Sequence, residues 1–269
     1  MERPAWAPPG IDLSVPSVSR MYDYYLGGSH NFEVDREAAR KAMAVFPGLP
    51  KVMQANRAFM RRAVRYLISQ GITQFLDIGS GIPTFGNVHE IAQEASDQAR
   101  VVYVDNDPVA VAHSKSVLGD DPRTGVVAGD FLEPRSILDS EPVSRLLDLD
   151  RPVALLLVAL LHFMRDEDRP YEVLAEYRQA LAPGSYLVIT HAAASDPGTR
   201  KRGAAVTDVY RRGGSTLELR SRDDIARFFE GFTLVEPGLV TPPEWRPESP
   251  LEDEDPVVFN GLAGVGRKA

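Results

Sequence analysis

From residue 73 onward, short apolar runs alternate with longer amphipathic segments. This is the pattern expected when parallel strands are joined by crossover helices, and it predicts an α/β fold. The central runs are continuously apolar, which is typical of strands that helices cover on both faces. The runs predict seven strands, at residues 74–78, 100–104, 125–128, 153–158, 186–190, 233–236 and 257–264.

The amphipathic segments predict helices at residues 87–95, 108–118, 168–181, 197–212 and 221–229. The last two strands have no room for a crossover helix, because a proline-rich linker with an acidic run at residues 252–255 separates them. Without that helix the final strand can enter antiparallel to its neighbour. We therefore expect a three-layer α/β/α fold around a seven-stranded, mostly parallel sheet whose last strand is antiparallel.

Helical segments also precede the first strand, at residues 17–26, 34–45 and 50–70. The stretch SRMYDYYLGGSHNF (residues 19–32) gathers aromatic and polar side chains around Gly27 and Gly28, a pair that breaks a helix and offers a hinge. An amphipathic helix that only packs on the sheet edge is the simpler alternative. The polar side chains favour a lid, so we expect residues 1–70 to form a helical cap and residues 71–269 the α/β domain.

The composition limits the partners of such a protein. Thirty basic against 38 acidic side chains give a net charge of -8, which argues against a nucleic-acid partner. Prolines interrupt the N-terminus where a signal peptide needs an apolar stretch, and the longest apolar run, residues 153–161, is about half a membrane span. With no cysteine in the chain, we expect a cytoplasmic protein without a membrane partner that acts on a small molecule.

The first predicted strand leads into a glycine turn, FLDIGSGIPT (residues 75–84), in which Asp77 precedes Gly79, Ser80 and Gly81. Glycines in such a turn let backbone amides approach a ligand closely. A tight turn with a purely structural role would have the same sequence. The motif alone therefore does not define a ligand site.

Acidic residues follow the next two predicted strands at the equivalent position. RVVYVDND contains Asp105 and Asn106 about twenty residues past the glycines, where a carboxylate can accept both hydroxyls of a ribose. GVVAGDF contains Asp130, which can accept from an adenine amino group while the ring or the amide of Phe131 supports the base. Because ligands of open α/β sheets bind outside the carboxyl ends of the strands, these residues predict one adenosine site.

Two adenosine cofactors fit this pattern, and the glycine turn separates them. A dinucleotide needs the turn G-x-G-x-x-G, but residues 79–84 lack the third glycine and include Pro83, which has no amide proton. The negative charge of Asp77 would repel phosphates and suits a sulfonium and an ammonium. The sequence therefore favours S-adenosylmethionine over NAD.

The blocks DIGSGIPT, VVYVDNDPVAVAHS and AGDFLEP resemble the glycine, ribose and adenine motifs of Rossmann-like methyltransferases. The N-terminal SRMYDYYLGGSHNFEVDREAA, with NRAFMRRAVRYL and NVHEIAQ, is similar to a family of S-adenosylmethionine-dependent methyltransferases that is abundant in actinobacteria and was long described as a domain of unknown function. The similarity spans about residues 11–266. It implies a Rossmann-like seven-stranded sheet that binds S-adenosylmethionine, and it implies no particular substrate.

The resemblance carries over residue by residue. It implies that Gly79, Ser80 and Gly81 line the methionine part, that Asp77 holds its ammonium, and that Ala159 lies beside the cofactor. Asp105 with Asn106 would bind the ribose, and Asp130 with Phe131 the adenine. The methionine carboxylate also needs donors, and the candidates are Arg20, Tyr22, Asn56 and Arg57.

Methyl transfer is a displacement at an activated carbon, so a base is needed only if the acceptor carries a proton. His162 follows the fourth predicted strand and is the candidate base, with His191 as the second choice. A histidine bonded structurally at a strand–helix junction is the alternative. In the cap, Tyr25 and His30 are candidate substrate-binding residues. His89 and Glu90 lack a second histidine four residues away, so no metal site is predicted.

Three functions follow, of different classes. The first is a methyltransferase that acts on oxygen or nitrogen of a small molecule. Amino-methylation of DNA bases loses support, because no Asn/Asp-Pro-Pro-aromatic motif follows the fourth strand. The second is a non-catalytic S-adenosylmethionine-binding regulatory protein, and the third is an NAD-dependent oxidoreductase.

Overall fold

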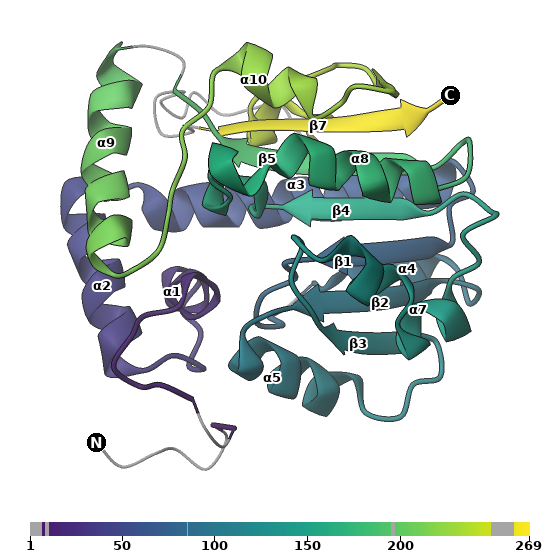
Figure 1. Ribbon diagram of the computed structural model, residues 1–269, viewed down its shortest axis with the longest axis horizontal. Coiled ribbons are helices and arrows are strands. Elements are labelled where there is room, and N and C mark those ends of the chain that lie inside the picture. The colour runs from purple at the N-terminus through teal and green to yellow at the C-terminus, as the bar shows by residue number, and fades with distance from the viewer. Residues whose placement is uncertain (1–6, 9–10, 85, 195–196, 249–260) are drawn as a thin grey trace.

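A seven-stranded sheet forms the centre of the computed structural model, which describes residues 7–8, 11–84, 86–194, 197–248 and 261–269 (Figure 1). The strand order is β3-β2-β1-β4-β5-β7-β6. Strands β1 to β5 pair in parallel, and β7 is antiparallel to both β5 and β6. This confirms the expected seven-stranded sheet with an antiparallel last strand. The strands are β1 (Gln74–Ile78), β2 (Arg100–Asp105), β3 (Thr124–Ala128), β4 (Ala154–Val158), β5 (Tyr186–Ala192), β6 (Phe232–Leu234) and β7 (Gly261–Lys268).

The last strand differs from its prediction. Residues 257–260 of the predicted strand lie outside the described residues, and β7 continues to Lys268 instead of ending at Gly264. Its glycines suggest the end of a strand. In the fold they make room for Phe229, because a Cβ at Gly264 or Gly266 would lie 3.0 or 2.8 Å from that ring.

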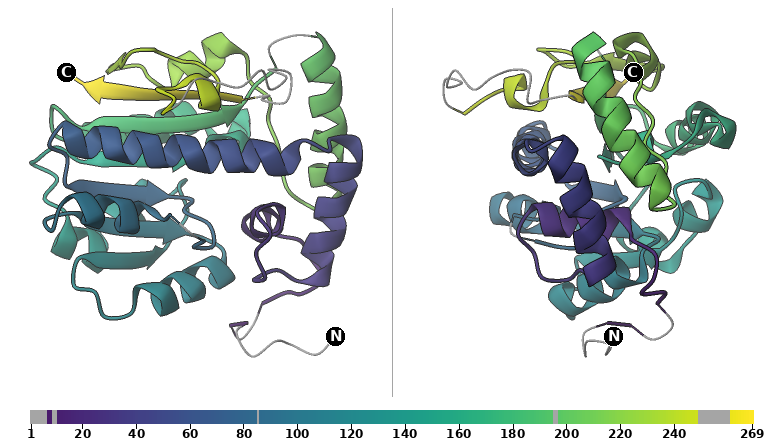
Figure 2. Two further views of the ribbon diagram at one scale, coloured as in Figure 1. Left: turned by 180° about the vertical axis from the view of Figure 1, so that it is seen from behind. Right: turned by 90° about the vertical axis from the view of Figure 1, so that its left-hand side faces the viewer.

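Helices cover both faces of the sheet, so the expected three layers are confirmed (Figures 1 and 2). On one face lie α3 (Leu49–Ser69) and α4 (Val88–Ala95), whose apolar side chains pack on β1 and β2. On the other lie α7 (Glu141–Leu146), α8 (Pro170–Ala180) and α10 (Arg222–Arg227). Two further helices are α5 (Pro108–Leu118) and the short α6 (Pro134–Leu138).

A group of helices lies beyond the carboxyl end of β4, at the left of Figure 1. It consists of α1 (Val18–Tyr25), α2 (Glu33–Val45) and α9 (Pro197–Arg212), and we call it the cap. One hydrophobic cluster joins these helices to the start of α3 through Met21, Ala39, Leu49 and Val206. The later part of α3 packs on the sheet, so this helix contributes to both the cap and the α/β layers.

Helix α9 occupies a different place from the one its sequence predicts. It is expected between two strands as a crossover helix, yet it packs on α2 (Figure 2). The physical reason is that α10 supplies the apolar surface against the sheet with Ile225 and the adjoining Phe228. No helix in the described part of the chain is long and apolar enough to cross a membrane.

Candidate active site

A polar cleft of about 580 Å³ lies at the carboxyl ends of β1 to β4. Ligands of open α/β sheets bind at this edge, so the cleft is where the sequence places the adenosine site. Of the predicted cofactor-binding residues, those that line it are Tyr22, Asn56, Asp77, Gly79, Ser80, Gly81, Asp105, Asn106, Asp130 and Ala159. Arg20 and Phe131 are not among the lining residues.

The glycine turn after β1 brings backbone close to the cleft. Gly79 and Gly81 have φ angles of 71° and 68°, which favour glycine. A Cβ at Gly79 would lie 2.7 Å from Leu160 Cδ1, so this position also needs glycine for its approach to the end of β4. Ser80 Oγ is buried and has no hydrogen-bond partner among the described residues. A buried hydroxyl without a partner is expected where a ligand completes the site.

Asp105 is held at the end of β2 by two backbone amides. The amide of Gly81 donates to its Oδ2 over 2.7 Å, and the amide of Asp107 to its Oδ1 over 2.8 Å. Burial raises the pKa of Asp105 to about 6, although these hydrogen bonds lower it. Each carboxylate oxygen has a second lone pair, so Asp105 can still accept from ribose hydroxyls.

Asp77 and Arg57 both line the cleft and interact electrostatically. Burial raises the pKa of Asp77 to about 7, Arg57 lowers it and the charge of Asp105 raises it. Arg57 Nη2 donates to Gly86 O and Asn87 Oδ1, while its buried Nε has no partner among the described residues. A carboxylate and a guanidinium side by side suit the ammonium and carboxylate of an amino acid.

At the third strand end, Asn106 Nδ2 donates to Asp130 Oδ2 over 3.2 Å, and both side chains line the cleft. Leu132 also lines it, and its amide donates to Asp130 Oδ1. The Phe131 ring does not face the cleft. It is buried and stacks on Tyr177, with centroids 5.4 Å apart, so Leu132 and not the Phe131 ring lines the cleft at this strand end.

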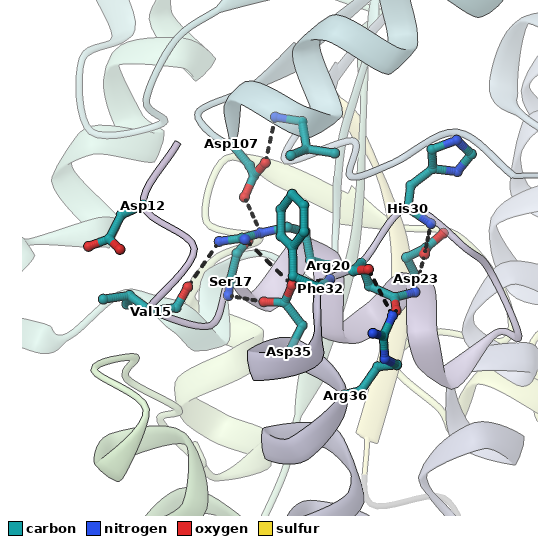
Figure 3. Close-up of polar contacts among 12 residues, drawn as sticks. Asp12, Val15, Ser17, Arg20, Asp23, His30, Phe32, Asp35, Arg36 and Asp107 are labelled. Atoms are coloured by element: carbon teal, nitrogen blue, oxygen red, sulfur yellow. Dashed lines mark hydrogen bonds and ion pairs between the residues drawn. The ribbon is translucent and has the colours of Figure 1, made fainter. Parts of the chain in front are cut away.

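Arg20 also lies elsewhere than expected (Figure 3). Its buried guanidinium lies 3.4 Å from Asp35 Oδ2 and 3.3 Å from Asp107 Oδ2, and it donates to Val15 O. Arg20 therefore does not reach the cleft, where the methionine carboxylate is expected. Arg57 is the arginine of α3 that lines the cleft instead.

The two predicted substrate residues of the cap are also directed away from the cleft. Tyr25 is buried, and its hydroxyl lies 3.2 Å from that of Tyr210. The His30 ring lies against the His113 ring at a centroid distance of 3.8 Å, tilted by 32°. Neither Tyr25 nor His30 lines the polar cleft or the second cavity described next. The pattern of alternating aromatic and polar residues does not show which of them point into the core.

A second, apolar cavity of about 110 Å³ lies between the cap and the sheet. It shares wall residues with the polar cleft, so the two spaces adjoin. The shared residues are Val18, Tyr22, Asn56, Ala159 and Phe163. Its polar side chains besides Tyr22 and Asn56 are His162, Thr190, His191 and Tyr210. An apolar cavity of about 150 Å³ holds a benzene ring, so this one suits a group of roughly that size.

Ala159 stands at the wall between the two spaces, directly after β4. It is a non-glycine residue with a φ of 59°, and its amide donates to Thr190 Oγ1 over 2.8 Å. Strained backbone of this kind is found at functional sites, where the surrounding structure fixes it. Thr190 lines the apolar cavity, and the sequence analysis missed it because a lone threonine at a strand end carries no motif.

The histidines of the apolar cavity are both neutral. Burial, with the electrostatic influence of Arg220 and His191, holds the pKa of His162 well below its ordinary value. Burial also lowers the pKa of His191 to about 3. His162 Nδ1 accepts from the amide of Ala192, so a neutral His162 carries its proton on Nε2. This is the arrangement of a hydrogen-bond donor, opposite to the one that a general base at Nε2 requires.

Arg220 lies within hydrogen-bond distance of His191, the second candidate base. Its Nη1 lies 3.0 Å from His191 Nε2, and His191 Nδ1 lies 2.7 Å from Ala192 O. Both ring nitrogens of His191 are therefore engaged, which leaves none to accept a proton. The described residues contain no group of histidine and carboxylate side chains that could hold a metal ion.

Comparison with known proteins decides the family. The family model described as S-adenosyl methyltransferase matches residues 4–269. The chain belongs to this family. Its activity is therefore S-adenosylmethionine-dependent methyl transfer, and S-adenosylmethionine is its cofactor. The NAD-dependent alternative does not hold.

Two solved structures are similar to this chain over nearly its whole length. A candidate methyltransferase from Thermobifida fusca YX is 41% identical, with 98% of this chain and 99% of that chain covered and a TM-score of 0.91. A DUF574 family protein from Streptomyces avermitilis MA-4680 is 39% identical, with 96% and 99% covered and the same TM-score. No curated protein matches the chain. The resemblance to an actinobacterial methyltransferase family is confirmed.

The cleft residues fit this cofactor. Asp77 can hold the ammonium, Arg57 the carboxylate and Asp105 the ribose. Ser80 Oγ and Arg57 Nε are buried and find no hydrogen-bond partner in the described part of the chain, so a ligand can bond them. Burial raises the pKa values of Asp77 and Asp105, and a cationic ligand nearby would favour their ionised forms.

Proposed function

We propose that this methyltransferase modifies an oxygen or nitrogen atom of a small, largely apolar acceptor that binds in the apolar cavity. The supporting observation is the shared wall. Tyr22, Asn56 and Ala159 line both the polar cleft and the apolar cavity. An acceptor ring in the apolar cavity can therefore meet a methyl group held in the polar cleft. The small volume and the apolar lining argue against a charged acceptor or a protein side chain on a folded surface.

In this scheme, most of the rate acceleration comes from aligning the acceptor atom with the methyl group. S-adenosylmethionine would supply a methyl group on a sulfonium, whose sulfur would keep the bonding pair as the acceptor attacks the carbon. Tyr22 and Asn56 stiffen the wall through the hydrogen bond from Asn56 Nδ2 to Tyr22 Oη, 2.9 Å long. Tyr22 in turn donates to Met53 O, which fixes α1 on α3.

His162 acts in this scheme as a hydrogen-bond donor. Its Nε2–H can hold an acceptor oxygen, which keeps a second lone pair for the attack, while its Nδ1 stays bonded to the amide of Ala192. The acceptor proton then passes to water, before or after the methyl group is transferred. This favours an amine or an easily ionised hydroxyl, which need no enzymatic base.

The test is an acceptor screen with a labelled methyl donor, biased towards single-ring amines and phenols. Val52→Phe places a ring in the apolar cavity, since Val52 lines that cavity and not the polar cleft. We expect it to lower kcat/KM for the acceptor by about tenfold or more. Its affinity for S-adenosylhomocysteine, measured by calorimetry, should stay unchanged.

Val45→Phe is the matched control, because Val45 is 42% exposed and lines neither space. It should behave as the unmodified protein in both assays. An unchanged kcat/KM in Val52→Phe would place the acceptor elsewhere. Binding of the cofactor without methyl transfer to any small molecule would contradict the proposal and favour a regulatory binder.

A further inference from the structure

Arg20 bridges the cap and the α/β domain through a buried set of charges, which we call the Arg20 network (Arg20, Asp35 and Asp107). The guanidinium projects from α1 between Asp35 on α2 and Asp107 at the start of α5 (Figure 3). All three side chains are less than one-tenth exposed. The Phe32 ring covers the guanidinium, with its centroid 5.1 Å from Cζ.

The network continues into the cofactor cleft through the backbone. Asp107 caps α5, since its Oδ1 accepts from the amides of Val109 and Ala110. Its own amide donates to Asp105 Oδ1, and Asp105 Oδ2 accepts from Gly81. The position of Asp107 therefore determines where one of the two backbone donors to the Asp105 carboxylate lies.

Electrostatics make Arg20 the residue that fixes this position. Two buried carboxylates face each other across one guanidinium, and removing the cation would leave both charges uncompensated. The planar fork of arginine can reach both carboxylates at once, which a lysine ammonium cannot. Asp107 is thus held from the side of the cap, opposite to the side that bonds Asp105.

We propose that Arg20 is a positioning residue for the cofactor: through Asp107 it orients the Asp105 carboxylate towards the ribose hydroxyls. The proposal rests on Asp105 as the ribose ligand, independently of the acceptor. It differs from direct binding of the methionine carboxylate by Arg20, and from a role that only stabilises the cap.

The experiment compares two ligands that share the adenosine part. S-adenosylhomocysteine carries an amino-acid end, and 5′-methylthioadenosine lacks it. Asp107→Asn keeps the oxygen that caps α5, removes the charge that faces Arg20, and leaves a balanced Arg20–Asp35 pair. Arg20→Lys keeps the charge and loses the fork. Each variant should weaken both ligands by the same factor, about tenfold, in titration calorimetry.

Two controls separate the alternatives. Asp35→Asn breaks only the cap side of the network, so its affinity for both ligands should stay unchanged even if its melting temperature falls. Arg57→Ala should weaken S-adenosylhomocysteine and spare methylthioadenosine, because Arg57 lies at the amino-acid end. This contrast shows that the two ligands report the two ends of the cleft.

Three results would overturn the proposal. The first is unchanged affinity for both ligands in Asp107→Asn, which carries the test alone if Arg20→Lys does not fold. The second is a loss confined to S-adenosylhomocysteine in Arg20→Lys, which would mean direct contact with the methionine end. The third is an equal loss of affinity in Asp35→Asn, which would mean that the network only maintains the cap.

Discussion

At the scale of single residues, Asp77 and Asp105 are buried carboxyl groups for which we propose contacts to an ammonium and to ribose hydroxyls. Their pKa values are raised to about 7 and about 6 from the ordinary 3.8, first of all because both are buried. At a pH between 3.8 and these raised pKa values, the folded protein keeps protons on Asp77 and Asp105 that the unfolded chain has lost. The free energy of unfolding of the ligand-free protein therefore falls as the pH rises through this window.

Ligand binding has the opposite pH dependence, because a bound ammonium favours ionised Asp77. We predict that affinity for S-adenosylhomocysteine falls by about tenfold from pH 8 to pH 6, since Asp77 is then mostly protonated. Asp77→Asn should bind weakly at pH 8 and lose most of this dependence. The measurement is titration calorimetry in a pH series.

Methylthioadenosine serves as the control ligand, because it has no ammonium. Its affinity should follow only the titration of Asp105, at lower pH. If affinity for S-adenosylhomocysteine were constant from pH 6 to pH 8, Asp77 would not be the partner of the ammonium.

At the scale of the elements, the turn after β1 depends on the end of β4. Gly79 and Gly81 both have positive φ, so alanine at either position costs about 1 kcal/mol in backbone strain. Only Gly79 faces a neighbour, Leu160, whereas a Cβ at Gly81 would meet nothing within 4 Å. We predict that Gly79→Ala lowers the free energy of unfolding by a further 1–3 kcal/mol or so, measured by urea denaturation without ligand.

Gly81→Ala is the matched variant, as it carries the strain without the clash. Equal losses in the two variants would mean that Leu160 moves aside at no cost. A Leu160→Ala background should remove the difference between them, because it removes the side chain that a Cβ at Gly79 would meet.

The elements also show what the sequence could predict. Six of the strands were placed within two residues of their observed bounds, because a buried strand must be an unbroken apolar run and the chain alternates such runs with helices. The glycine turn and the carboxylates Asp105 and Asp130 follow from the same rule, since strand ends locate the ligand edge.

The packing partners of the cap helices could not be predicted in this way. An amphipathic pattern shows that α9 packs on something, but not whether its partner is the sheet or α2. Likewise, Arg20 and Tyr25 are polar residues on one short helix, and only the fold shows that their partners are Asp107 and Tyr210. Such partners come from distant parts of the chain, which local sequence does not encode.

At the scale of the whole molecule, the cap is assembled from both halves of the chain. Local contacts of Asp23 surround its glycine pair, Gly27 and Gly28. Asp23 accepts from the His30 amide and the Asn31 side chain, and a Cβ at Gly28 would collide with it. The cap is therefore held by local hydrogen bonds at this turn and by the cluster that joins α1 to α9.

Because that cluster is shared, we predict that the cap loosens as a unit. Met21 on α1 is 2% exposed in the cluster and lines neither cavity, so Met21→Ala should cost about 3 kcal/mol. Hydrogen exchange should then quicken in α9, far along the chain, as much as in α1, while the strands keep their protection.

Leu174→Ala is the control for a general loss of stability, since Leu174 is equally buried on α8 in the sheet layer. It should not quicken exchange in α9 selectively. If Met21→Ala loosened α1 alone, the helices would open independently, and the apolar cavity between cap and sheet could then admit an acceptor through α1 without movement of α9. Joint loosening would mean that α1 and α9 open as one unit through the cluster they share.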